Sequence, residues 1–153
     1  MELSDFTAKK KFQLIQNYHV CVIGIGGVGS WVAESLARHG IGKITLIDMD
    51  HIAESNINRQ IHALDSTIGE SKIQAMKNRI VDINPMCQVE CIDDFIEESN
   101  IARYISSQFN YVIDAIDQSS VKINLAEHCQ VNNLALLMIG GAGGRTDPSR
   151  IKV

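Results

Sequence analysis

Four glycines stand close together near the start of the chain, where chemistry on a phosphate group is the first possibility. The run Gly24-Ile25-Gly26-Gly27-Val28-Gly29 follows the apolar stretch 19–23. Because glycines lack side chains, the backbone can turn tightly there and approach phosphate oxygens. Free amides and the positive dipole at a helix start then stabilise negative charge. The spacing predicts a phosphate-binding loop, and the alternative is a tight turn that binds nothing.

Two acidic residues follow this loop at the end of the next apolar run. Asp48 lies 19 residues after Gly29, and Asp50 lies two residues further on. An acid at the position of Asp48 can accept hydrogen bonds from ribose hydroxyl groups. Asp50 is either a second contact to the nucleotide or a solvated loop acid. Taken alone, the glycine loop and Asp48 are typical of a dinucleotide dehydrogenase.

The segment after Asp50 favours a triphosphate over a dinucleotide. It contains SNINRQ, with Asn56, Asn58 and Arg59, and then GESK, which ends at Lys72. A triphosphate carries about four negative charges, and phosphoryl or nucleotidyl transfer needs cations placed on it. Arg59 can hold phosphate oxygens bidentately, and Lys72 adds a point charge. Either cation alone could also be a solvated surface residue.

A second pair of acids follows a later apolar run. Asp114 and Asp117, in the string DAID, close a predicted parallel strand and therefore lie at the same rim as the glycine loop. Because Mg²⁺ prefers carboxylates plus phosphates, Asp117 is the predicted metal ligand. Asp114 either orients the site by accepting hydrogen bonds or is a buried structural acid.

The elements that must position these residues alternate between strand and helix. Strands are predicted over 19–23, 43–47, 87–92, 111–113 and 134–139, and another begins at 151–153. Helices are predicted over 8–17, 28–39, 56–64, 69–84, 97–107 and 119–132, and the apolar face of 28–39 holds Val28, Trp31, Val32 and Leu36. This alternation implies an α/β fold with a Rossmann-like, doubly wound, mostly parallel sheet and helices on both faces. Ligands of such sheets bind at the carboxyl ends of the strands.

The length and composition of the chain exclude several classes of protein. The chain has 153 residues, a net charge of −4, 45% hydrophobic and 21% charged residues, which predicts one globular domain and excludes a mainly disordered or fibrous chain. No run of about 18 apolar residues is present, so no membrane association is expected. Four cysteines without a disulfide framework, and a start without an apolar signal core, predict a cytoplasmic protein.

Taken together, GIGGVG, LIDMD, SNINRQ, GESK and DAID resemble the motifs of the ThiF/MoeB/HesA adenylating family, which includes the adenylation domains of ubiquitin-activating enzymes. Longer strings, among them GIGGVGSWVAE, NRQIHAL and GGAGGRTDPSRI, are similar to its tRNA threonylcarbamoyladenosine dehydratase branch. The resemblance implies that a substrate carboxylate attacks the α-phosphorus of ATP, which gives an acyl-adenylate and pyrophosphate. In the dehydratase branch the carboxylate belongs to a threonyl group on a tRNA adenosine, and cyclisation follows.

The resemblance also implies roles for individual residues. Gly27 and its neighbours would contact phosphate, Asp48 would hold the ribose, and Asp117 would bind Mg²⁺. The expected catalytic residues are Arg59, Lys72 and Asp117. The expected ATP-binding residues are Gly24, Gly26, Gly27, Gly29, Asp48, Asp50, Asn56, Asn58, Arg59, Lys72 and Asp117.

The chain departs from the family pattern near both of its ends. No arginine precedes Arg38, so the family's N-terminal arginine, which reaches the ATP of the partner subunit, is missing or replaced by Lys9–Lys11. The family continues well beyond Val153, so residues 1–153 are expected to be one nucleotide-binding domain, the N-terminal part of a longer architecture. The resemblance further implies a homodimer, tRNA contacts in regions beyond this chain, and sulfur-transfer proteins as possible partners.

Several alternatives stay open at the level of sequence. A close rival function is adenylation of the C-terminal glycine of a ubiquitin-like sulfur carrier. A different class is a non-catalytic nucleotide-binding or dimerisation module, and a nicotinamide dehydrogenase is the weakest option. His62 is either a site residue beside Arg59 or a lone core histidine. The glycines of 140–144 form either a loop on the substrate side or a turn.

Overall fold

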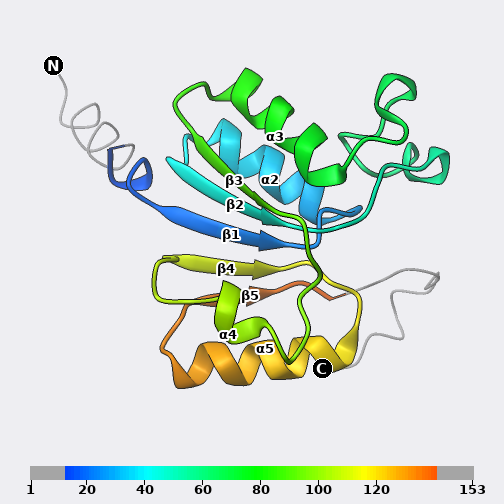
Figure 1. Ribbon diagram of the computed structural model, residues 1–153. Coiled ribbons are helices and arrows are strands. Elements are labelled where there is room, and N and C mark those ends of the chain that lie inside the picture. The colour runs from blue at the N-terminus through cyan, green and yellow to red at the C-terminus, as the bar shows by residue number, and fades with distance from the viewer. Residues whose placement is uncertain (1–12, 141–153) are drawn as a thin grey trace, which may run out of the picture.

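The computed structural model describes residues 13–140, which form a five-stranded sheet between two layers of helices (Figure 1). The strands are β1 His19–Ile23, β2 Lys43–Ile47, β3 Gln88–Ile92, β4 Tyr111–Asp114 and β5 Leu136–Met138. The helices are α2 Gly29–Arg38, α3 Lys72–Ile83, α4 Ile101–Tyr104 and α5 Ser119–Val131, with the 3-10 turns η1 Glu54–Asn56 and η2 Asp65–Thr67. The predicted α/β fold with helices on both faces is confirmed.

The sheet has the order β3-β2-β1-β4-β5, and all of its paired strands run parallel. The chain first builds β1, β2 and β3 in one direction and then crosses to β4 on the other side of β1. Ile23 is level with both Ile47 and Asp114, so the ends of these three central strands lie side by side. The strand order reverses between β1 and β4, which is where open α/β sheets bind their ligands.

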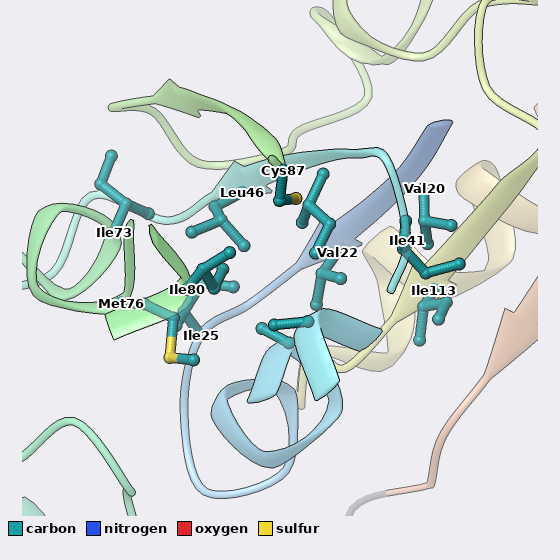
Figure 2. Packing of buried hydrophobic residues seen from close by; sticks show 13 residues of the cluster. Val20, Val22, Ile25, Ile41, Leu46, Ile73, Met76, Ile80, Cys87 and Ile113 are labelled. Carbon is teal, nitrogen blue, oxygen red and sulfur yellow. The ribbon is translucent and has the colours of Figure 1, made fainter. Parts of the chain in front are cut away.

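Strand β1 is buried along its whole length because helices cover both sides of it. Successive side chains of a strand point to opposite faces, so Val20 and Val22 pack toward α2 and α3 while Cys21 and Ile23 pack toward α4 and α5. Figure 2 shows the first of these clusters, where Val22 lies among side chains of β2 and α3. A strand covered on both faces reads as a continuous apolar run, as this one does.

Helix α2 buries only part of the face that its apolar residues predict, because Val32 and Leu36 pack against the core while Val28 and Trp31 do not. Val28 and Trp31 are 44% and 54% exposed, whereas the small side chains of Ser30, Ala33 and Ala37 are buried. The reason lies at the glycine loop, because a Cβ atom on Gly29 would lie 1.8 Å from the carbonyl oxygen of Gly24. The helix starts in close backbone contact with the end of β1, and the small side chains of Ser30, Ala33 and Ala37 are the ones that become most deeply buried.

Two predicted helices are also corrected. The segment 56–64 contains turns after η1 instead of an α-helix, since the Asn56 side chain accepts a hydrogen bond from the Ala53 amide at 3.0 Å and stabilises a tight local turn. The segment 97–107 is helical only over α4. Helix α3 starts at Lys72, after Gly69 with its φ of +86°. In the predicted helix 8–17, residues 13–15 are helical, while 8–12, 141–144 and 151–153 lie outside the described residues.

Candidate functional site

A cleft of about 880 Å³ opens at the carboxyl ends of the strands, where the fold predicts a ligand site. Its walls come from the glycine loop, the end of β2, the turn after η1, the start of α3 and the loops after β3, β4 and β5. It brings together nine residues expected from the sequence, namely Gly24, Gly26, Gly27, Asp48, Asp50, Asn56, Arg59, Lys72 and Asp117. Gly29 and Asn58 are the two expected residues that do not line it.

The glycine loop needs its glycines for two separate reasons. Gly24 has a φ of +83°, a conformation that side chains disfavour, and it turns the chain out of β1. Gly29 is required for the close contact between α2 and Gly24, so its part is packing. At Gly27 a Cβ atom would come within 3.2 Å of the aliphatic stem of Arg59. Gly27 thus lets the arginine side chain lie directly over the loop.

Asp48 fixes the shape of this loop through its carboxylate. Its Oδ2 accepts a hydrogen bond from the Ile25 amide at 2.7 Å, and its Oδ1 accepts one from the Asp50 amide at 2.8 Å. Asp48 is only 7% exposed. An ionised carboxylate has about four acceptor sites, so each oxygen retains capacity for a ribose hydroxyl. Asp48 therefore links the glycine loop to the end of β2 and still faces the cleft.

Lys72 and Asp50 form an ion pair at the floor of the cleft. The Lys72 Nζ lies 2.6 Å from the Asp50 Oδ2, and the Lys72 amide donates to the Asp50 carbonyl at 3.0 Å. The lysine side chain is 7% exposed, whereas the carboxylate is 52% exposed. Neither sequence interpretation of Asp50 anticipated this contact. Asp50 orients and neutralises the ammonium group that the cleft presents to a ligand.

Arg59 is exposed on the opposite wall, on the turn after η1. Its Nη1 donates to the Ser55 carbonyl at 2.8 Å and to the Asn58 Oδ1 at 3.0 Å. The Arg59 carbonyl accepts a hydrogen bond from the Trp31 Nε1 at 2.9 Å. Asn58 thus contacts the guanidinium instead of the cleft. Trp31 joins this turn to the first turn of α2.

The two acids after β4 have different surroundings. Asp114 is fully buried, pairs with Lys122 at 2.7 Å and accepts a hydrogen bond from the Ile116 amide at 2.9 Å. This matches the interpretation of Asp114 as a buried structural acid that also orients the loop. Asp117 is exposed on the cleft wall, and the described structure gives its carboxylate no hydrogen-bond or ion-pair partner.

The carboxylates that line the cleft could hold Mg²⁺ only together with the phosphates of a bound nucleotide. Among residues 13–140, no three His, Cys, Asp or Glu side chains gather in a group that could hold a metal. Mg²⁺ is commonly held by one or two carboxylates together with substrate phosphates and water. The free carboxylate of Asp117 fits this manner of binding.

The loop after β3 is part of the cleft that sequence reasoning missed. It contributes Asp94, Phe95, Ile96 and Glu97, and Gln60 and Gln118 are further lining residues that were not expected. Ile96 is buried and Phe95 is half exposed at 46%. With Ile23, Ile47 and Ile116 these side chains make an apolar side of the cleft. The sequence did offer one sign that this loop belongs to the cleft. The loop follows a predicted strand of the parallel sheet, and such loops lie at the carboxyl edge where ligands bind.

His62 and the cysteines lie outside the cleft lining. His62 is 2% exposed, and neither of its ring nitrogens has a hydrogen-bond partner among the described residues. Burial, with help from the charges of Lys72 and Arg79, lowers the pKa of His62 to about 4. All four cysteines are free thiols, and burial raises the pKa of Cys21 and Cys87, so these thiols stay neutral.

The parallel sheet, the glycine loop after β1 and the cleft at the carboxyl ends of the strands define a Rossmann-like α/β protein. The ThiF family model matches residues 1–152, and the chain belongs to the ThiF family. The chain is 52% identical over 145 residues to the tRNA threonylcarbamoyladenosine dehydratase of Escherichia coli strain K12, which covers 95% of the chain and 54% of that protein. It is 29% identical over 143 residues to the molybdopterin-synthase adenylyltransferase of Haemophilus influenzae, which covers 94% of the chain and 56% of that protein.

A solved structure extends this comparison to the fold. The crystal structure of the E. coli tRNA N6-threonylcarbamoyladenosine dehydratase TcdA in complex with ATP matches with a TM-score of 0.89 and 50% identity, over 97% of this chain and 61% of that one. The chain spans about half the length of the curated relatives it matches. In the described residues, the longest helix has 13 residues, and none is long and apolar enough to cross a membrane.

Proposed function

We propose that the chain binds ATP in the cleft and activates a carboxylate by adenylation, and that the carboxylate is that of threonylcarbamoyladenosine in tRNA. Ring closure on the activated acyl carbon would then expel AMP and give the cyclic form of the modified base, with a net loss of one water. The observation that carries the proposal is the convergence of Arg59, Lys72 and Asp117 around the glycine loop in one cleft. The 52% identity to a tRNA threonylcarbamoyladenosine dehydratase supports this substrate over a sulfur carrier.

The chemistry needs no nucleophile from the protein, because the substrate carboxylate attacks the α-phosphorus. Charge on the phosphate oxygens rises in the transition state, and fixed cations in a partly dry cleft stabilise it. Lys72 and Arg59 line the same cleft from different elements, the start of α3 and the turn after η1, and both can contact the triphosphate. Asp117 would hold Mg²⁺, which neutralises phosphate charge and favours the departure of pyrophosphate.

The two sides of the cleft also suggest how the nucleoside binds. Asp48 retains acceptor capacity for the ribose, next to the glycine loop that would take the phosphates. The apolar side formed by Ile23, Ile47, Ile96 and Ile116 suits a planar base. Gly29 and Asn58 support the site from outside, through α2 and through Arg59.

The wider assembly belongs to this proposal as well. We propose that residues 1–153 are the N-terminal, nucleotide-binding part of a longer cytoplasmic enzyme that forms a homodimer. The exposed apolar side chains of Val28, Trp31 and Ile57, close to the cleft, are available for a partner subunit. Contacts to tRNA, and to any sulfur-transfer protein, would come mainly from regions beyond this chain.

The test is ATP-dependent release of pyrophosphate in the presence of defined carboxylate substrates. With tRNA that carries threonylcarbamoyladenosine, we expect pyrophosphate release and loss of one water from the modified base, measured by mass spectrometry. The same tRNA without the modification is the matched control. Stimulation only by a ubiquitin-like carrier protein would replace this function with the sulfur-carrier reaction. ATP binding without turnover on either substrate would leave a nucleotide-binding module.

A further inference from the structure

Lys122 and Asp114 form a buried ion pair next to the cleft. None of the sequence motifs that predict the site includes Lys122. Lys122 sits in the first turns of α5 and does not line the cleft. Its Nζ lies 2.7 Å from the Asp114 Oδ2 and donates to the Ile139 carbonyl at 2.9 Å. The Lys122 side chain is 14% exposed and that of Asp114 is 0% exposed. One ammonium group thus joins α5 to the ends of both β4 and β5.

These contacts converge on two loops that form the cleft wall. Asp114 uses its other oxygen, Oδ1, to accept the Ile116 amide at 2.9 Å, and its carbonyl accepts the Ile139 amide at 2.9 Å. Ile116 and Asp117 line the cleft on one loop, and Ile139 and Gly140 line it on the other. The turn that presents Asp117 therefore has its geometry set by a carboxylate that Lys122 holds in place.

We infer that Lys122 is a positioning residue that aims the Asp117 carboxylate at the metal–phosphate position, through Asp114 and the Ile139 carbonyl. This inference rests on the proposed function, in which Asp117 binds Mg²⁺. A buried charge pair is a costly way to obtain stability alone, because both ions must leave water. Fixed geometry at a site is a better attested use of such a polar network.

The experiment removes both charges together, so that no unpaired ion stays buried. In Asp114→Asn/Lys122→Met, the asparagine oxygen still accepts the Ile116 amide, while the hydrogen bond from Lys122 to the Ile139 carbonyl is lost. ATP affinity is measured by calorimetry with Mg²⁺ and again with a chelator. We expect about a tenfold weaker affinity with Mg²⁺ and less than a twofold change without it, the scale on which outer-shell partners of a metal ligand act. The single substitution Lys122→Arg keeps the charge beside Asp114, so this variant should retain most of the Mg²⁺-dependent ATP affinity.

The matched control is Lys43→Met/Glu90→Gln, which removes an ion pair of similar length, 2.7 Å, between β2 and β3. Lys43 is the first residue of β2 and lies at the amino ends of the strands, away from the cleft. The ATP affinity should therefore not change, either with Mg²⁺ or with the chelator. A second test places Lys122→Met/Asp114→Asn in an Asp117→Asn background. Because Lys122 acts through Asp117, its effect on Mg²⁺-dependent affinity should disappear there.

Wild-type affinity for Mg²⁺ and ATP in a folded Asp114→Asn/Lys122→Met variant would overturn the inference. So would an equal loss of affinity with and without Mg²⁺, which indicates general damage. If this variant does not fold, the neutral polar pair Asp114→Asn/Lys122→Gln decides, with at least a threefold loss expected only in Mg²⁺. A wild-type chain that bound no ATP would overturn the proposed function and the inference with it, whereas an unaffected variant overturns the inference alone.

Discussion

Replacing Lys72 with methionine should separate the contribution of this residue to catalysis from its contribution to stability. Methionine keeps most of the length of the side chain and removes its charge. The Asp50 carboxylate left behind is 52% exposed, so water can solvate it. The Lys72 side chain is buried, but methionine needs no partner there, so the expected loss of stability is about 1 kcal/mol, the upper end of the range for exposed ion pairs.

The catalytic effect should be much larger, because in the proposed function the same ammonium group would face phosphate oxygens in the transition state. Loss of one preorganised charge-stabilising donor costs about 10²–10³-fold in rate, or about 2.7–4 kcal/mol. The assay is pyrophosphate release under single-turnover conditions, with thermal unfolding measured on the same sample. Asp50→Asn is the control, since it removes the same ion pair and keeps the lysine. Near-normal pyrophosphate release by Lys72→Met would refute the role given to Lys72, whatever its stability.

Three further changes test the rest of the site. Arg59→Ala should slow pyrophosphate release by about 10²–10³-fold with little change in melting temperature, because the side chain is exposed; a normal rate would remove Arg59 from the site. Asp48→Ala should weaken ATP binding and also destabilise the fold by about 1–3 kcal/mol, since the Ile25 and Asp50 amides lose their acceptor, and unchanged thermal unfolding would contradict this. His62 binds a proton more readily when unfolded, so stability should fall as the pH drops from about 6.5 to about 4, by up to about 3 kcal/mol. Denaturant unfolding of His62→Gln should show a flatter pH profile, and an identical profile would count against a buried neutral histidine.

The predictions that held are those whose physical basis is local. The arrangement of a strand before the glycine loop and a helix after it was predictable because both elements are visible in the pattern of apolar residues. Asp48 followed from its place at the end of the next strand. The topology of a parallel sheet then brings residues such as Asp117 to the same edge, because every strand of this kind ends there.

The predictions that failed depend on which distant group a side chain meets. The apolar residues of 28–39 indicated a buried face, but close backbone contact at Gly29 leaves Val28 and Trp31 exposed while Val32 and Leu36 pack against the core. Asp50 is the partner of Lys72, a contact between residues 22 positions apart in the chain. Asn58 has the same residue type as Asn56, yet one contacts Arg59 and the other caps a turn. Spacing alone does not distinguish such cases.

The hydrogen bond from Trp31 to the Arg59 carbonyl gives the protein a built-in optical reporter. Trp31 is the single tryptophan of the chain, and it is 54% exposed beside the turn that presents Arg59. Indole emission depends on polarity and hydrogen bonding, so any ligand that moves this turn will change the emission of one identifiable side chain. The arrival of a nucleotide can therefore be followed in real time without a label.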